Sequence, residues 1–264
     1  MSLLPANELR VLLAHDALNT ARAGWRWQGG ALREPSSEIT RSWRAALAAL
    51  EALLRTQARP ARLHVTLSNR LVRYAFVPWQ AGLKGVAVQA YQRDCFVRVY
   101  GDGARQWQIA ATPPRRGAPG LASAVDAALV SELQALCQRT RAQLADVQPL
   151  LAAVVNCWRR VLQGDCFWLV LAEPGYLCLA LSQHRTWRAV RTARTGANAL
   201  AALGQLIERE SLLADTDATP TQVFLWAPQF ETADMEQVAG LPAVRLGPNA
   251  AHPLAALFDC GAGQ

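Results

Sequence analysis

Long hydrophobic runs are missing from this sequence. Hydrophobic residues make up 52% of its 264 positions, yet no uninterrupted apolar stretch approaches the roughly 20 residues that a membrane-spanning helix needs. The N-terminal stretch from Met1 to Leu13 carries Glu8 and Arg10, unlike the apolar segment of a signal peptide. We therefore expect a cytoplasmic protein that has no membrane span up to its last residue, Gln264.

Cysteines at metal-ligand spacing are also missing. None of the six cysteines forms a Cys-x-x-Cys motif or has a histidine at ligand spacing, which argues against a zinc site and against a disulfide framework. We expect free, mostly buried thiols and no metal. The six are Cys95, Cys137, Cys157, Cys166, Cys178 and Cys260.

Lysine is nearly absent: Lys84 is the single lysine among the 27 lysine and arginine residues. Arginine therefore supplies almost all of the positive charge behind the net charge of +7. A basic surface can attract nucleic acid or anionic lipid. The arginines are scattered, however, and the pairs Arg115-Arg116 and Arg159-Arg160 do not make the basic stripe of a nucleic-acid-binding domain. We expect no nucleic-acid partner.

The hydrophobic content is enough for a large core, in one large domain or in two smaller ones that pack together. Periodicity predicts strands and an early amphipathic helix in the first part of the chain. The expected strands are Leu9 to His15, Arg22 to Gln28, Leu63 to Leu67 and Leu71 to Val77, and the helix is Ser37 to Gln57. The first two strands form a hairpin through Asp16 to Asn19, and the last two flank the turn Ser68-Asn69.

The middle of the chain reads as helical with one strand. The expected helices are Val86 to Tyr100, Ala122 to Arg141 and Val147 to Leu162, with a strand from Gln106 to Ala111 and a linker-like loop from Pro113 to Gly120.

From Cys166 onward the pattern is three antiparallel strands, helix, strand, helix, strand, which is the order of a ribonuclease-H-like half. The expected strands are Phe167 to Ala172, Tyr176 to Ser182, Trp187 to Thr192, Gln222 to Trp226 and Ala243 to Leu246, and the helices are Asn198 to Leu213 and Thr232 to Ala239. The turn Glu173-Pro174-Gly175 joins the first two strands as a hairpin, since proline fixes φ and glycine tolerates positive φ.

The first part of the chain can be read as the same plan with an inserted helix and strand. Two such halves in tandem make an actin-like α/β fold, with two mixed sheets flanked by helices and a nucleotide cleft between the halves. We predict a first half over residues 1–162, which contains a small inserted subdomain at about 80–119, and a second half over residues 163–264.

Several segments resemble the actin-like proteins of bacterial envelope machines, namely the PilM-type proteins of type IV pilus assembly and the cytoplasmic domain of GspL-type secretion proteins. The resemblance covers about residues 10 to 246. It is carried by Leu67 to Trp79, by the helix end Val99-Tyr100-Gly101, by Val147 to Leu150 leading into Asn156, and by the strands around Glu173-Pro174-Gly175.

The resemblance implies a nucleotide site that needs an acidic residue beside a glycine in each hairpin, and paired glycines after a late strand. Here Asp16 has no glycine beside it. Glu173 and Gly175 are present, but Pro174 removes one N–H donor. After the late strand, Ala227-Pro228 replaces the paired glycines. Asp16, Glu173 and Gly175 are thus the nucleotide-contacting candidates only if ATP and Mg²⁺ bind at all.

Other residue combinations are weaker candidates. Asp16 is better explained as a turn-capping residue, and its neighbour His15 points to the opposite face of the strand. Ser68, His64 and Asp94 have the residue types of a hydrolase triad, but Ser68 lacks the Gly-x-Ser-x-Gly elbow. A ribonuclease-H-type nuclease needs three or four clustered carboxylates, and only two can be placed.

The nine tryptophans exceed what one core readily absorbs. Core packing is the simpler explanation for any one of them, but Trp79, just before the predicted insertion, and Trp107, within its predicted strand, could line a groove for a partner peptide. In the PilM-type relatives, a groove beside the inserted subdomain receives a short cytoplasmic tail of a membrane partner.

The resemblance therefore predicts a non-catalytic cytoplasmic scaffold of a type IV pilus or type II secretion-like assembly. It would bind the cytoplasmic tail of an inner-membrane protein, lie peripherally at the inner membrane through that partner without inserting directly, and use no cofactor; a homodimer stays open. The alternative is an ATP-binding or weakly ATP-hydrolysing actin-like protein.

Overall fold

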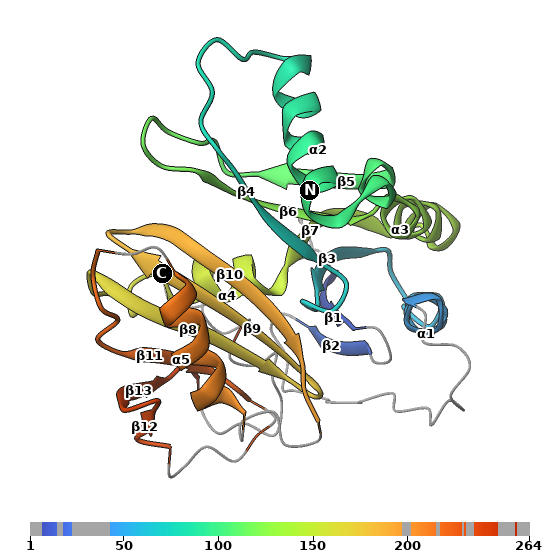
Figure 1. The fold of residues 1–264 in the computed structure, drawn as a ribbon. Helices are drawn as coiled ribbons and strands as arrows, with labels where there is room; N and C mark the ends of the chain where they lie inside the picture. Colours follow the sequence, from blue (N-terminus) through green and yellow to red (C-terminus); the bar gives the residue numbers. More distant parts are fainter. Residues whose placement is uncertain are drawn as a thin grey trace.

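A computed structural model describes residues 7–14, 18–22, 43–196, 202–214, 217–228, 230, 235–247 and 257. The helices are α1 (Trp43–Arg55), α2 (Val86–Tyr100), the short 3₁₀ helix η1 (Asp102–Gln106), α3 (Ala127–Thr140), α4 (Leu150–Trp158) and α5 (Leu203–Leu213). The strands fall into three sheets, drawn in Figure 1.

The first sheet has four strands in the order β2-β1-β3-β7. The central strand β1 pairs antiparallel with β2 and parallel with β3, and β3 pairs parallel with β7. A bulge lies in the β3–β7 pairing, where Leu63 faces Leu144 but His64 faces Asp146. The bounds are β1 (Asn7–Leu13), β2 (Leu18–Arg22), β3 (Ala61–Leu67) and β7 (Gln143–Pro149).

The second sheet has six strands in the order β10-β9-β8-β11-β13-β12. It repeats the plan of the first, because β8 pairs antiparallel with β9 and parallel with β11, and β11 pairs parallel with β13. The bounds are β8 (Cys166–Glu173), β9 (Tyr176–Gln183), β10 (Thr186–Arg194), β11 (Val223–Trp226), β12 (Gln237–Val238) and β13 (Leu241–Arg245).

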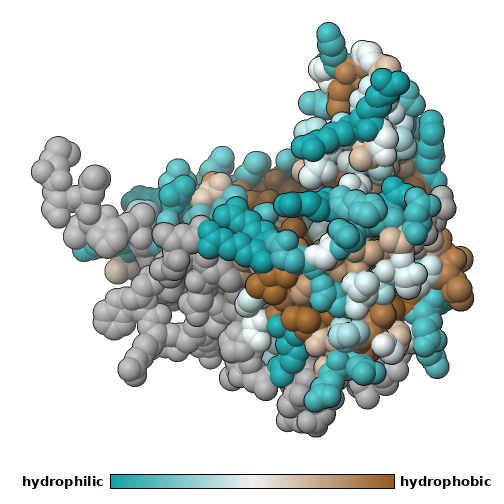
Figure 2. All heavy atoms as spheres, turned by 90° about the vertical axis from the view of Figure 1, so that its left-hand side faces the viewer, coloured by the Kyte–Doolittle hydropathy of each residue, from teal (hydrophilic) through white to brown (hydrophobic). Residues whose placement is uncertain are grey.

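The third sheet is small and lies beside the first. Its antiparallel strands are in the order β4-β6-β5, with β4 (Arg73–Val77), β5 (Trp107–Ala111) and β6 (Gly120–Asp126). Helix α2 packs on this sheet through Cys95 and Phe96 near its C-terminal end. The part of the molecule around α2 projects from the rest, as Figures 1 and 2 show from two sides.

Every residue of β8 and β9 is buried, because both faces of their sheet are covered. Residues of β8 alternate between two cores, as the two-residue period of a strand requires. Leu169 and Leu171 join the core that includes the first sheet, whereas Trp168 and Val170 join the core beneath α5. The first and second sheets thus share one continuous hydrophobic core.

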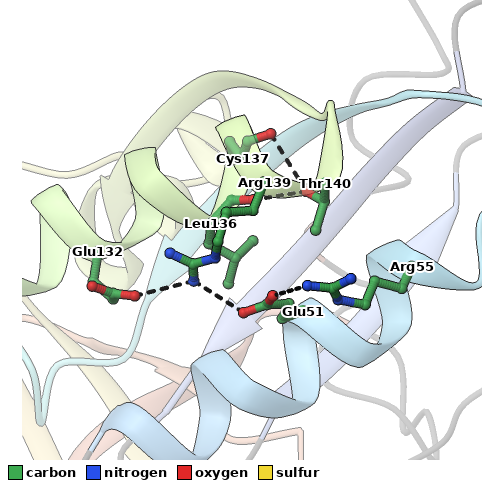
Figure 3. A network of polar contacts seen from close by, with 7 residues as sticks. All are labelled: Glu51, Arg55, Glu132, Leu136, Cys137, Arg139 and Thr140. Carbon is green, nitrogen blue, oxygen red and sulfur yellow. Dashed lines mark hydrogen bonds and ion pairs between the residues drawn. The ribbon is translucent and has the colours of Figure 1, made fainter.

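Helices α1 and α3 are joined on the surface by a charged network (Figure 3). Glu51 accepts hydrogen bonds from Arg55 at 2.7 Å and from Arg139 at 3.0 Å, and Arg139 also donates to Glu132 at 3.1 Å. These arginines lower the pKa of Glu51 to about 2. Beneath the network, α1 buries Leu47, Leu50 and Leu54 along one face, with the spacing of an amphipathic helix.

Most expected elements are present, including α2 with the predicted bounds, but two predicted helices begin too early. Residues 122–126 belong to strand β6, and residues 147–149 belong to strand β7, so α3 and α4 are shorter than expected. The small residues Ala122 and Ala124 are both buried in β6. The alanine-rich sequence around them is typical of a helix, but pairing with neighbouring strands determines their conformation.

Two further expectations were wrong in detail. The segment predicted as a helix up to Ala239 contains strand β12 in its described part. Leu18 and Asn19, predicted as part of the first hairpin turn, belong to strand β2. The strands on either side of Ser68-Asn69 belong to different sheets, β3 to the first and β4 to the third. The predicted boundaries, at residue 162 and around the insertion at 80–119, stay a prediction.

Four cysteines are free and buried, as expected: Cys95, Cys137, Cys166 and Cys178. Cys157 is disulfide-bonded, so the prediction of a free thiol is wrong there. Burial raises the pKa of the four free thiols, which keeps them protonated and unreactive. Among the described helices, none combines the length and apolar composition needed to cross a membrane.

Candidate functional site

Glu173 lies at the tip of the β8–β9 hairpin, and its side chain is buried against the turn that follows β3. The Ser68 hydroxyl donates a short hydrogen bond to Glu173 Oε2. Asn69 donates to Oε1 twice, from its backbone N–H at 3.1 Å and from Nδ2 at 3.0 Å. Both carboxylate oxygens are therefore bound by residues about a hundred positions earlier in the chain.

Asn69 extends this contact to the small sheet. Its Oδ1 accepts a hydrogen bond from the hydroxyl of Tyr74 in β4 at 2.7 Å, and the backbone carbonyl of Tyr74 accepts one from the hydroxyl of Tyr100 at the end of α2 at 2.8 Å. The backbone N–H of Ser68 donates to Leu13, the last residue of β1, at 2.9 Å. All three sheets are thus tied together at the turn Ser68-Asn69.

The electrostatics of Glu173 reflect this enclosure. Burial raises the pKa of its carboxyl group, opposed by the hydrogen bonds from Ser68 and Asn69 and by the charge of Arg70. Burial also raises the pKa of the Tyr74 hydroxyl and of the Cys178 thiol, and the Glu173 charge raises both further. The site therefore favours neutral groups, whereas a metal-orienting carboxylate must be ionised and open to its ligand.

Gly175 adopts positive φ (68°), as the Glu-Pro-Gly turn predicts. An added Cβ there would lie 3.3 Å from Nη2 of Arg70 and 3.6 Å from the carbonyl oxygen of Thr195. The Arg70 guanidinium also lies over the Tyr176 ring, 6.0 Å from its centroid. The space beside Gly175 is therefore shared with protein groups, Arg70 foremost among them.

The other proposed elements of a nucleotide site are less informative. His15 and Asp16 lie outside the described residues. Ala227, which follows β11, is buried and Pro228 is partly buried. Within the described ranges, no three His, Cys, Asp or Glu side chains gather as a metal site would require.

The three triad candidates do not meet. Ser68 is buried on Glu173, whereas His64 Nδ1 makes a short contact with Asp146 on the neighbouring strand, and Asp94 is exposed on α2. This arrangement leaves no serine hydroxyl beside a histidine base.

A groove of about 330 Å³ lies between the first sheet and the small one. One wall comes from β5 and β6 and the other from β7, while α3 contributes Val130 and Gln134. Both β5 and β7 are edge strands, so the groove runs between two sheet edges. The lining residues are Leu67, Gln108, Ile109, Ala110, Ser123, Val125, Val130, Gln134, Leu144, Ala145, Asp146, Val147 and Pro149.

Trp79 and Trp107, the two predicted partner contacts, do not come together. Val77, just before Trp79, pairs with one end of β6, whereas Trp107 pairs with the other end. The seven residues of β6 span about 20 Å. Trp107 packs against Phe96 and Tyr100, with ring centroids 6.3 and 5.4 Å apart, whereas Trp79 is 42% exposed. Neither lines the groove, and their role in partner binding stays a prediction.

The sequence pattern pointed to Glu173 and Gly175 but missed Asn69 and Tyr74. The only local signal was a pair of polar residues, Ser68 and Asn69, directly after an apolar strand. Their pairing with Glu173 depends on how two distant parts of the chain pack, which no local pattern reports.

No family model matches the sequence, and the search of curated proteins gives no match. Solved structures do match, over nearly the whole chain. The cytoplasmic domain of EpsL, an inner-membrane component of the type II secretion system of Vibrio cholerae, matches 98% of this chain and 96% of its own, with a TM-score of 0.64 and 10% identity.

Two further solved structures are similar. The PilM–PilN type IV pilus biogenesis complex matches 96% of this chain and 90% of its own, with a TM-score of 0.63 and 13% identity. A Bacteroides thetaiotaomicron protein of unknown function, described as having an actin-like ATPase fold, matches 96% of both chains, with a TM-score of 0.60 and 7% identity. The chain therefore has the actin-like ATPase fold, with mixed sheets flanked by helices.

Proposed function

We propose that this protein is a non-catalytic scaffold on the cytoplasmic side of the inner membrane, in an assembly of the type IV pilus or type II secretion kind. It binds the short cytoplasmic tail of an inner-membrane protein and reaches the membrane through that partner. The similarity to the EpsL cytoplasmic domain and to the PilM–PilN complex supports the type of assembly.

The observation that carries the absence of catalysis is the environment of Glu173. In a nucleotide site, the acid of this hairpin would face the metal or its water. Here Ser68 and Asn69 occupy both carboxylate oxygens, and burial raises the carboxyl pKa. Glu173 is buried, so binding of Mg²⁺ would require its side chain to turn out of this contact. That would leave the Asn69 donors unpaired at a cost of about 1–3 kcal/mol each.

The groove between β5 and β7 is the place that we propose for the tail. It is partly open to solvent, it is lined by apolar residues with a few polar ones, and it adjoins the small sheet. Its Ile109, Leu144 and Val147 offer apolar contacts, and Asp146 is the acidic residue of its lining. An extended segment of a partner suits such a space because it needs little depth.

The test is site-specific photo-crosslinking in cells that express the protein. A photoreactive residue at Gln108, which is exposed in the groove wall, should crosslink an inner-membrane protein through its cytoplasmic tail. The same residue at exposed Glu208 of α5 is the control. A synthetic peptide of the captured tail should then bind the purified protein and should lose binding to Ala110→Trp, which narrows the groove. Equal crosslinking from both positions, or peptide binding that ignores Ala110→Trp, would contradict the groove assignment.

The second candidate function is ATP binding or weak hydrolysis. The actin-like ATPase fold is the observation that favours it. Gly175 of the hairpin turn also has the positive φ that glycine supplies where a backbone approaches a ligand closely. The two candidate functions predict different effects of nucleotide on stability, because a nucleotide that binds the folded protein stabilises it against unfolding.

A further inference from the structure

The chain carries a basic and apolar tip that neither the groove nor the Glu173 contact involves. Two loops leave the same end of the small sheet, because Val77 pairs with Gly120 and Ala111 pairs with Ala122. They are residues 78–85, between β4 and α2, and residues 112–119, between β5 and β6. Figure 1 shows both loops at one extremity of the molecule, and we call the two loops together with the adjoining Val86, the first residue of α2, the tip.

The tip exposes apolar side chains that nothing in the described part of the chain covers. Trp79 is 42% exposed and Val86, the first residue of α2, is 80% exposed. Helix α2 has no fully buried residue before Cys95, so its first turns stand away from the small sheet. Trp79 and Val86 are therefore apolar surface that stays in water unless another molecule covers it.

The charge of the tip has one sign. Its basic residues are Lys84, Arg115 and Arg116, all exposed, and neither loop contains an acidic residue. Reciprocal backbone hydrogen bonds of 2.9 Å between Arg115 and Ala118 close the second loop into a tight turn, which presents the two arginines at its end. Figure 2 shows hydrophilic and hydrophobic residues side by side on this projecting part.

We propose that the tip binds an anionic lipid surface, with the basic residues at the headgroups and Trp79 and Val86 in the interfacial layer. Tryptophan favours the membrane interface because its ring is apolar and its N–H is polar, and basic residues gain from the negative surface potential of the bilayer. A soluble polyanion would use only the arginines and leave the apolar side chains in water. This contact is shallow, needs no spanning helix, and does not depend on the groove or its tail.

The experiment is co-sedimentation of the purified chain with vesicles of phosphatidylglycerol and phosphatidylcholine, and with vesicles of phosphatidylcholine alone. We expect binding only to the anionic vesicles, and weaker binding as salt is raised. Charge reversal by Arg115→Glu with Arg116→Glu should lower the partition coefficient at least about twentyfold, because each basic residue near an anionic surface contributes about fivefold. Reversal of the other arginine pair, Arg159 and Arg160, is the matched control and should have a much smaller effect.

Single substitutions test the contribution of the apolar side chains separately from that of the charges. A stability measurement on each variant excludes misfolding as the cause of weaker binding. Trp79→Ser should weaken vesicle binding severalfold, whereas Leu212→Ser, at a residue that is 88% exposed on α5, should not. Lys84→Glu in the first loop repeats the charge test, and thermal unfolding shows that each variant is folded. The proposal is overturned if the chain does not bind the anionic vesicles, or if reversing either arginine pair weakens vesicle binding equally. It is also overturned if the substitutions weaken binding of a protein partner but leave vesicle binding unchanged.

Discussion

The two oxygens of Glu173 show how the packing around one side chain can decide between a ligand site and a structural contact. The same Glu-x-Gly turn that would cradle a phosphate is here closed by Ser68, Asn69 and Arg70. The turn itself was predictable, because proline and glycine between two apolar runs favour a hairpin. Its partners were not, since they approach through tertiary packing rather than through local preference.

The buried carboxyl group gives a pH dependence of stability with a definite sign. Glu173 has a raised pKa in the folded state, above its ordinary value of 4.5. As pH rises above 4.5 the unfolded chain loses this proton first, so the wild type becomes less stable until the folded pKa is passed. Below about pH 4.5 the carboxyl group is protonated in both the folded and the unfolded state, and the effect vanishes.

We therefore expect Glu173→Gln to gain stability relative to the wild type as pH rises from about 4. The amide can still donate to Ser68 and accept from Asn69 without carrying a charge. Urea unfolding at a series of pH values measures the difference, with Glu208→Gln on exposed α5 as the control for charge. A difference that does not change with pH would show that Glu173 is not desolvated in the folded state.

At the scale of elements, helices and strands with a strong hydrophobic periodicity were predicted correctly, whereas strands with a weak periodicity were not. The central strands β8 and β9 and the helix α2 lie where the sequence predicted them, because glycine or proline bounds each one. Residues 122–126 of strand β6 and 147–149 of strand β7 were predicted as helix. Their alanines and their single bulge hide the two-residue period, and pairing with β4, β5 and β3 supplies what local preference lacks.

The small sheet has its own core, and a cavity there should loosen it locally. Phe96 is fully buried and packs edge-on to Trp107. Phe96→Ala should remove about 3–5 kcal/mol of local stability. Hydrogen exchange should quicken in β4, β5 and α2 while β8 and β9 keep their protection. Equal loss of protection in both sheets would instead mean that the molecule unfolds as one cooperative unit.

At the scale of the whole molecule, the order of elements was enough to predict the fold. The repeated plan of the two larger sheets and their shared core match the expected pair of ribonuclease-H-like halves. The same order says nothing about activity, because the fold hosts enzymes and scaffolds alike. In our proposal, the residues that close the junction between the sheets make this chain a scaffold rather than an enzyme. These residues are Ser68, Asn69 and Glu173.

Nucleotide binding is the property that tests this account most directly. Thermal unfolding of the purified chain with and without Mg-ATP should give the same midpoint, because the carboxylate that would hold the metal is already bound by the protein. A ligand at a hundred times its dissociation constant would stabilise the folded state by about 2.7 kcal/mol, which such a measurement resolves. A clear upward shift with Mg-ATP that Glu173→Gln abolishes would contradict the non-catalytic scaffold.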